Sequence, residues 1–175
     1  MMTSKEFLKA VANGEADAVQ LFMDLLRETH TPYAVVGGLA VNAYAEPLVS
    51  LDLDVVVVAG DIDKICRKAE QRAFGVEKFP HSINLTVRGS DLRIQIQLDR
   101  RYQEFLTRAE KKTILGYELC VACKEDVMQG KLWAFEDQAR RKSKRQKDLA
   151  DILRLLEVYP ELQGMIPESI RKLID

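Results

Sequence analysis

The chain contains little cysteine, little histidine and no long apolar run, and each shortage excludes a class of protein. Three cysteines are too few, and odd in number, for a disulfide framework. The two histidines, His30 and His81, lie far apart and show no metal-ligand spacing. No stretch of about 18 apolar residues occurs, so we expect no membrane-spanning segment. The first fifteen residues include the acids Glu6 and Glu15, which argues against a signal peptide and favours the cytoplasm.

The sequence also lacks an excess of charge of one sign. It has 26 basic and 27 acidic residues, a formal net charge of -1 and an isoelectric point of about 6.2. This balance argues against a protein that coats nucleic acid, although it is compatible with a local basic site. The charges are unevenly placed. Residues 1–60 hold three basic and eight acidic residues, whereas residues 140–147 hold six basic residues and no acid. Such a segment is expected to meet an anion.

Hydrophobic residues make up 47% of the chain, enough to bury a core, and the length of 175 residues favours one domain. Periodicity predicts helices over residues 15–29, 39–46 and 61–74, and strands over 33–36, 51–58, 83–87, 92–98 and 114–122. From residue 124 onward it predicts two long helices divided near 138–143, and a short helix after Pro167. We therefore expect a single α/β (α+β) domain over residues 1–175, with a core at about 15–122 and a helical C-terminal region at about 123–175.

Two aspartates on the strand at 51–58 form the clearest chemical signal. Alternate side chains of a strand share a face, so Asp52 and Asp54 project the same way, about 7 Å apart. Because like charges repel, each carboxylate needs a partner. Mg²⁺ binds one or two carboxylates and completes its shell with water and phosphate oxygens. The pair therefore predicts a divalent metal site, and the alternative is an exposed edge strand with two solvated acids.

Gly37 and Gly38 stand between a predicted strand and a predicted helix. Glycine lets a ligand approach the backbone closely, and the N–H groups that begin a helix favour a phosphate. Taken alone, however, the pair is more simply a tight turn that needs glycine for its backbone angles.

Taken together, these residues resemble the signature of the nucleotidyltransferase superfamily, which has a polymerase-β-like fold. The resemblance is carried by VVGGLAVNAYAEPLVSLDLDVVVV, residues 35–58, and it is most evident with bacterial minimal nucleotidyltransferases and AbiEii-type toxin components. It implies a mixed sheet flanked by helices, over about residues 15–157. It also implies roles for five residues: Gly37 and Gly38 against a nucleoside triphosphate (NTP), Asp52 and Asp54 on Mg²⁺ or Mn²⁺, and Ser50 beside them.

The family pattern includes a third carboxylate on a later strand, and this sequence departs from it. The matching segment is LRIQIQLD, in which Arg93, Gln95, Gln97 and Asp99 share one face by period two. Gln95 or Gln97 occupies the expected position, unless a shifted register brings Asp99 there. An amide acts neither as a general base near neutral pH nor as an anionic metal ligand. We therefore expect weak transfer activity, whereas the two-aspartate site is less affected.

Lys131 falls on the apolar face of the helix predicted after residue 124, between Val127 and Ala134. A lysine on such a face must reach solvent, pair with an acid or meet a ligand. Related nucleotidyltransferases place a lysine on a helix after the core, aimed at the nucleotide phosphates. The resemblance therefore implies that Lys131 binds nucleotide, and the alternative is a side chain that reaches solvent at the rim of the core.

The cationic segment at residues 140–147 has two interpretations. A solvated helix face explains most of it, with i,i+4 pairs of Lys144 with Asp148 and of Lys147 with Asp151. Its six positive charges nevertheless exceed what two acids neutralise. Toxin-type members of the family have a similar basic helix with Lys-Asp-x-x-Asp near the active site. The resemblance thus implies a functional Asp148 and a structural Asp151.

Two functions are compatible with these observations. In the first, the protein is an enzyme that transfers a nucleoside monophosphate from an NTP to a hydroxyl of RNA or protein, with Mg²⁺ or Mn²⁺ held by Asp52 and Asp54. RNA would meet residues 140–147. In the second, it is a catalytically weakened protein of the same fold that binds nucleotide or RNA, or regulates a partner chain as in a toxin–antitoxin pair. A purely structural domain would leave the same-face aspartates unexplained.

Overall fold

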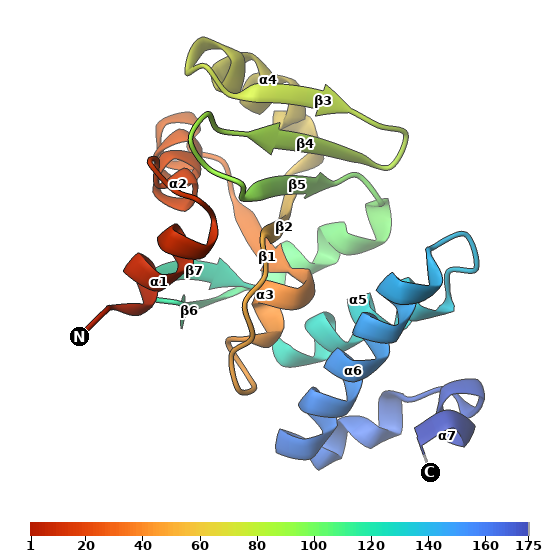
Figure 1. Cartoon of the computed structure of the whole chain (residues 1–175). Coiled ribbons are helices and arrows are strands. Elements are labelled where there is room, and N and C mark those ends of the chain that lie inside the picture. The colour runs from red at the N-terminus through yellow and green to blue at the C-terminus, as the bar shows by residue number, and fades with distance from the viewer. Residues whose placement is uncertain (175) are drawn as a thin grey trace.

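The computed structural model of the chain describes residues 1–174 and contains a seven-stranded mixed sheet with helices on both sides (Figure 1). This confirms the predicted α/β (α+β) class. Along the sheet the order is β3-β4-β5-β2-β1-β7-β6. The strands are β1 (Tyr33–Val36), β2 (Asp52–Val57), β3 (Gly75–Lys78), β4 (Ser82–Thr86), β5 (Arg93–Gln97), β6 (Glu110–Ile114) and β7 (Tyr117–Val121).

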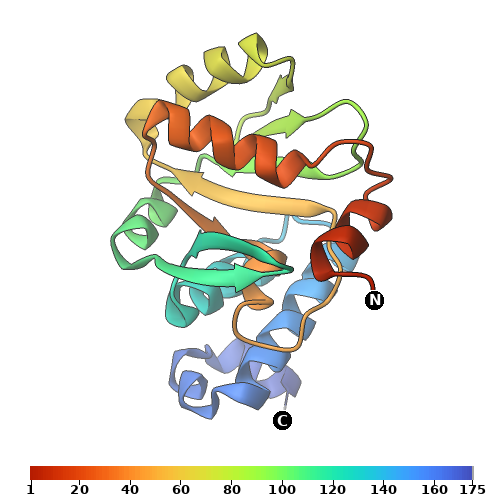
Figure 2. The same cartoon turned by 90° about the vertical axis from the view of Figure 1, so that its left-hand side faces the viewer.

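The described residues contain seven α-helices. They are α1 (Ser4–Val11), α2 (Ala18–Thr29), α3 (Gly37–Val41), α4 (Ile62–Gln71), α5 (Lys124–Glu136), α6 (Lys142–Val158) and α7 (Glu168–Ile174). Helices α2 and α4 pack together over one face, whereas α5 and α6 pack together beyond the other, with α3 contacting both of them and the sheet (Figures 1 and 2). No helix within residues 1–174 combines the length and apolarity needed to cross a bilayer.

The central strand β2 has one apolar and one polar face in its first half. Leu53 and Val55 are buried among the side chains of the core, whereas Asp52 and Asp54 project toward the side of α5 and α6. Strand β2 runs antiparallel to β1 and parallel to β5. Because both neighbours are paired along its length, β2 is not the exposed edge strand that the alternative interpretation of the aspartates required.

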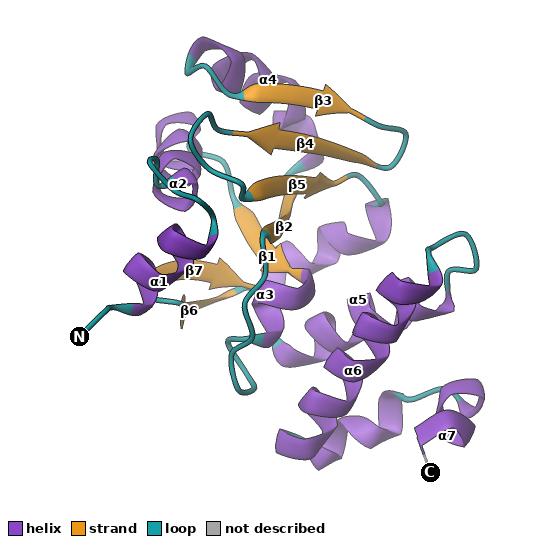
Figure 3. Ribbon diagram, in the orientation of Figure 1, coloured by secondary structure: helices purple, strands orange, loops and turns teal. Residues whose placement is uncertain are grey.

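Several elements differ from the sequence prediction. The strand predicted over 114–122 is present as β7 at Tyr117–Val121, but its first residues end β6 and form the turn of the β6–β7 hairpin, at Leu115 and Gly116 with φ of 48° and 83°. The helix predicted over 39–46 is the shorter α3, and the connection to β2 is a long loop (Figure 3). Helix α1, strands β3 and β6 and the 3-10 helix at Arg100–Arg108 (η2) were not predicted. The hairpin predicted over 83–98 is confirmed as β4 and β5.

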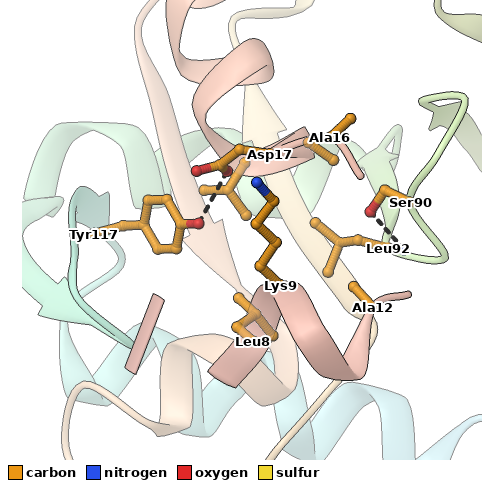
Figure 4. Close-up of a pocket in the computed structure, with 10 residues that line it drawn as sticks. Leu8, Lys9, Ala12, Ala16, Asp17, Ser90, Leu92 and Tyr117 are labelled. Carbon is orange, nitrogen blue, oxygen red and sulfur yellow. Dashed lines mark hydrogen bonds between the residues drawn. The ribbon is translucent and has the colours of Figure 1, made fainter. Parts of the chain in front are cut away.

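A small crevice lies where α1 and the start of α2 meet the turn before β5 (Figure 4). Its volume is about 10 Å³, which is space for a single water molecule. Tyr117 donates a hydrogen bond from its hydroxyl to Asp17 over 2.9 Å, and Asp17 also accepts the backbone N–H of Gln20 over 3.0 Å. The crevice therefore lies where these elements pack together, and its lining residues do not form a candidate reaction centre.

Candidate active site

A cavity of about 640 Å³ lies between the polar face of β2 and β5 and the helices α5 and α6. This volume is typical of sites for small molecules and cofactors. Its lining contains all six predicted site residues and the two glutamines, namely Gly37, Gly38, Ser50, Asp52, Asp54, Gln95, Gln97 and Lys131. Residues that are far apart in the sequence thus line one cavity.

Gly37 and Asp54 are in close contact at the floor of the cavity. Gly37 begins α3 with φ of +71°, a conformation that residues with a Cβ rarely adopt. A Cβ at Gly37 would also overlap with Oδ2 of Asp54. Both backbone angle and space therefore require glycine here. Gly38 differs, because its Cβ would make only an ordinary contact with Asp151 at 3.8 Å.

The carboxylate of Asp54 has neither a hydrogen bond nor an ion pair from any residue in the described part of the chain (residues 1–174). Burial raises the pKa of Asp54 to about 6, and the positive charge of Lys131 opposes that rise. An unpartnered acid with a perturbed pKa in a cavity is a frequent property of functional sites. The arrangement favours a cation at Asp54.

Asp52 differs from Asp54, because its carboxylate already has cationic partners. Arg93 donates from Nε to Oδ1 of Asp52 over 3.0 Å, and its Nη2 lies 2.8 Å from the same oxygen. Lys144 Nζ lies 3.5 Å from Oδ2. The hydroxyl of Ser50 accepts the backbone N–H of Asp52 over 3.2 Å, so Ser50 fixes the beginning of β2.

The strand register decides which residue stands where the third carboxylate was expected. Gln95 on β5 pairs with Asp54 on β2, and Gln97 lies two residues further along. Asp99 lies outside the cavity lining, where its carboxylate accepts hydrogen bonds from the backbone and side chain of Arg101. The shifted register that would have brought Asp99 to the site is therefore wrong, and Gln95 occupies the position.

Lys131 is buried and bridges two aspartates of α6. Its side chain donates to Oδ1 of Asp148 over 3.0 Å and lies 2.7 Å from Oδ2 of Asp151. The relative exposure of Lys131 is 7% and that of Asp148 is 1%, so the rim interpretation is wrong. Burial alone would lower the pKa of Lys131, but the carboxylates of Asp151 and Asp148 outweigh it and hold the pKa above its ordinary value.

Two arginines complete this network of charges. Arg140 donates from Nε to Oδ2 of Asp148 over 2.7 Å, and Arg154 donates from Nη1 to Oδ1 of Asp151 over 2.8 Å. The expected i,i+4 pairs of Lys144 with Asp148 and of Lys147 with Asp151 do not occur within residues 1–174. The two aspartates point toward α5 and the cavity, and their charges are balanced there.

The donor set around Asp54 suits a hard divalent cation that arrives with some of its own ligands. Two carboxylates on one strand face the cavity, and Mg²⁺ commonly takes one or two carboxylates together with phosphate oxygens and water. No group of three or more acids, histidines and cysteines within residues 1–174 could form a protein-only metal cage. The residues therefore fit a metal ion shared with a phosphate ligand.

Comparisons with known proteins bear on the fold. No family model and no curated protein matches the chain. Among solved structures, the antibiotic-resistance factor ANT(2'')-Ia matches with a TM-score of 0.63 at 10% identity, covering 89% of this chain and 90% of that one. The lincosamide adenylyltransferase LnuA gives 0.53 at 15%, covering 80% and 98%. An antigenic nucleotidyltransferase-like protein from Paracoccidioides brasiliensis gives 0.57 at 19%, covering 97% and 90%. The chain has a nucleotidyltransferase-like fold.

Within this nucleotidyltransferase-like fold, sequence reasoning assigned no role to two cations of the cavity lining, Arg93 and Arg154, and did not foresee the partner of a third, Arg140. Period two had placed Arg93 on the strand face of Gln95, but it did not indicate that Arg93 would pair with Asp52. Arg154 stands three residues after Asp151, a helical spacing that could have suggested their pairing. Arg140 lies outside α6 and eight residues before Asp148, and no local periodicity predicts their contact.

The cationic segment of this nucleotidyltransferase-like fold divides into inward and outward residues. Arg140 and Lys144 pair with aspartates, and Arg145 donates from Nε to the backbone carbonyl of Phe135 over 2.6 Å. The exposed members without an ion pair in the described residues are Arg141, Lys142 and Lys147. Three of the six cations therefore line the cavity, namely Arg140, Lys144 and Lys147, whereas Arg141, Lys142 and Arg145 do not.

Proposed function

We propose that the protein binds an NTP together with Mg²⁺ or Mn²⁺ in this cavity and transfers the nucleoside monophosphate to a hydroxyl group of RNA, with pyrophosphate as the leaving group. The observation that carries the proposal is Asp54, an unpartnered carboxylate in close contact with Gly37 and two residues from Asp52 on the same strand face. Such a pair needs a cation, and a triphosphate supplies the oxygens that complete the shell of a hard metal ion.

Each site residue has a distinct task in this proposal. Asp52 and Asp54 would hold the metal ion, which supplies charge stabilisation at the phosphoryl oxygens. Gly37 allows the backbone to approach a phosphate, because no Cβ stands in the way. Helix α3 has only five residues, so its N-terminal dipole adds little. Ser50 lines the cavity and orients the beginning of β2.

The role proposed for Lys131 is less direct than the sequence implied. To bind a phosphate, its ammonium group would have to leave Asp148 or Asp151, both of which it contacts within 3.0 Å. It still contributes positive charge to the wall of the cavity. Lys131 therefore supports the site by fixing α5 against α6, and any contact with the distal phosphates would be a second task.

The charges of the cavity favour a polyanionic acceptor over an amine-rich one. An amine needs a free carboxylate, and four of the five aspartates that line the cavity already pair with lysine or arginine within residues 1–174. These are Asp52, Asp126, Asp148 and Asp151. ANT(2'')-Ia has been solved in complex with adenylyl-2''-tobramycin, an amine-rich molecule. Here Arg141, Lys142 and Lys147, which have no ion pair within residues 1–174, suit a phosphate backbone instead.

A second candidate function is a binding or regulatory protein with weak or no transfer, for example one half of a toxin–antitoxin pair located in the cytoplasm. The observation that favours it is Gln95, which pairs with Asp54 where a third carboxylate was expected. An amide cannot accept the proton of an attacking hydroxyl near neutral pH. The two candidates share the nucleotide site and differ in turnover.

Calorimetry tests the shared part of both candidates. We expect the wild-type protein to bind ATP or another NTP only in the presence of Mg²⁺ or Mn²⁺. The Asp52→Asn/Asp54→Asn double variant should lose this metal-dependent binding while its thermal unfolding stays cooperative. The matched control is Asp99→Asn, which removes an acid from the strand end outside the cavity. Equal NTP affinity in the double variant and the control would refute the site.

A gain-of-function substitution tests the difference between the candidates. We expect Gln95→Asp to raise incorporation of label from an α-labelled NTP into an RNA pool by about tenfold or more, because general-base help is worth about 10²–10⁴-fold. Gln97→Asp is the control, since Gln97 lies two residues beyond the partner of Asp54. Rapid incorporation by the wild-type protein, with no increase in Gln95→Asp, would contradict the proposal that Gln95 weakens the transfer activity.

A further inference from the structure

The two aspartates that the proposed function assigns to one metal ion are in different electrostatic states. Asp52 has a cation at each carboxylate oxygen, with Arg93 at 2.8–3.0 Å from Oδ1 and Lys144 at 3.5 Å from Oδ2. Asp54 has no such partner within residues 1–174. A metal ion that uses both acids must therefore displace cations at Asp52 but meets none at Asp54.

Arg93 and Lys144 reach Asp52 from different sides of the cavity. Arg93 stands opposite Asp52 in the register of β2 and β5, and Lys144 belongs to the first turn of α6. Their side chains are 41% and 31% exposed, unlike that of Lys131 at 9%. Either cation can therefore turn toward a ligand in the cavity without leaving an unpaired charge in the protein interior.

We propose that Arg93 and Lys144 exchange partners when the metal and the triphosphate bind. In the free protein they hold Asp52, and in the complex they bind phosphate oxygens while the metal ion takes their place at Asp52. This inference rests on the proposed function and names the phosphate-binding residues of the same site. A divalent cation repels both side chains, whereas a triphosphate attracts them, and the guanidinium fork of arginine matches phosphate oxygens.

The exchange makes metal and nucleotide binding cooperative. Metal ion alone must compete with Arg93 and Lys144 for Asp52, and the displaced cations then have no partner. When the triphosphate is present, they gain one. Because coupling between two ligands is reciprocal, each ligand strengthens binding of the other by the same factor.

Titration of Mn²⁺ with and without ATP tests the exchange in the full-length chain. We expect Arg93→Gln to bind Mn²⁺ alone about tenfold more tightly than wild type, and to bind ATP in the presence of Mn²⁺ about tenfold more weakly. Lys144→Gln should show the same opposite changes to a smaller degree, since its distance to Asp52 is longer. Thermal unfolding confirms that each variant is folded.

Lys111→Gln is the control, because Lys111 is an exposed lysine of β6 that does not line the cavity. It should change the Mn²⁺ affinity by less than about threefold, since an exposed charge outside the cavity is screened. An equal increase for Lys111→Gln and Arg93→Gln, or no increase for Arg93→Gln, would overturn the exchange. So would unchanged ATP affinity in Arg93→Gln. Wild-type protein that binds Mn²⁺ but no NTP would refute the proposed function instead.

Discussion

Replacing Lys131 by methionine is expected to lower the free energy of unfolding by about 3 kcal/mol, because it leaves two buried acids without their shared counter-ion. The ammonium group contacts Asp148 at 3.0 Å and Asp151 at 2.7 Å, and all three residues are at least nine-tenths buried. Methionine has a similar volume, so the loss is electrostatic. This loss is near the lower end of the range for a broken buried ion pair, because Arg140 still pairs with Asp148 and Arg154 still pairs with Asp151.

Urea denaturation followed by circular dichroism measures this loss, with Lys147→Met as the control for removing an exposed lysine from the same wall. The control should change the free energy of unfolding by less than about 0.5 kcal/mol. Adding Asp148→Asn to Lys131→Met should recover part of the stability, because the uncompensated charge disappears. A Lys131→Met variant as stable as the control would show that the bridge contributes nothing, and would return Lys131 to a ligand-binding role.

The part of the site that local sequence patterns could predict is the part that lies within one supersecondary unit. Strand β2 is recognisable from period two and four valines, and this also places Asp52 and Asp54 on one face. Gly37 lies at the strand-to-helix joint next to them, and the structure shows a steric reason for it at Asp54. These features need no knowledge of tertiary packing.

The charge network could not be predicted in the same way, because it depends on how α5 packs against α6. The sequence shows Lys131 on an apolar helix face, but three interpretations of that position were open. Only the packing of the two helices brings Asp148 and Asp151 to its ammonium group. The helical spacing of Lys144 and Asp148 suggested a local pair, yet Lys144 extends across the cavity to Asp52 instead.

The missed elements were short, and their local signals were weak or unused. Helix α1 begins with a capping box in which Thr3 and Glu6 bond reciprocally, a signal present in the sequence. Strand β3 has four residues at the sheet edge and no apolar alternation. The β6–β7 turn places the non-glycine residue Leu115 at positive φ, which sequence patterns do not anticipate.

Replacing Asp54 by asparagine is expected to stabilise the metal-free protein at pH 8 by an amount on the order of 2 kcal/mol, while it removes metal-dependent nucleotide binding. Burial raises the pKa of Asp54 from 3.8 to about 6. Between these values the folded protein holds a proton that the unfolded chain releases, so stability falls as pH rises from about 4 to about 6. Asparagine does not ionise, and the variant should lack this decline. A shift of about two units corresponds to about 3 kcal/mol, reduced here because Asp54 is partly exposed.

Chemical denaturation in EDTA between pH 4 and pH 8 provides the measurement, and Asp52→Asn is the matched control on the same strand. Asp52 is paired with Arg93 and Lys144, so its replacement should bring no gain in stability. Adding Mn²⁺ with ATP should raise the melting temperature of wild type but not of Asp54→Asn, because a ligand stabilises only the state that binds it. Two results together would show that Asp54 is an ordinary surface acid. The stability of wild type and Asp54→Asn would change with pH in the same way, and Mn²⁺ with ATP would stabilise both proteins equally. The variant is expected to gain stability and to lose its ligand. A residue that serves binding shows this combination of effects, whereas a residue that serves packing does not.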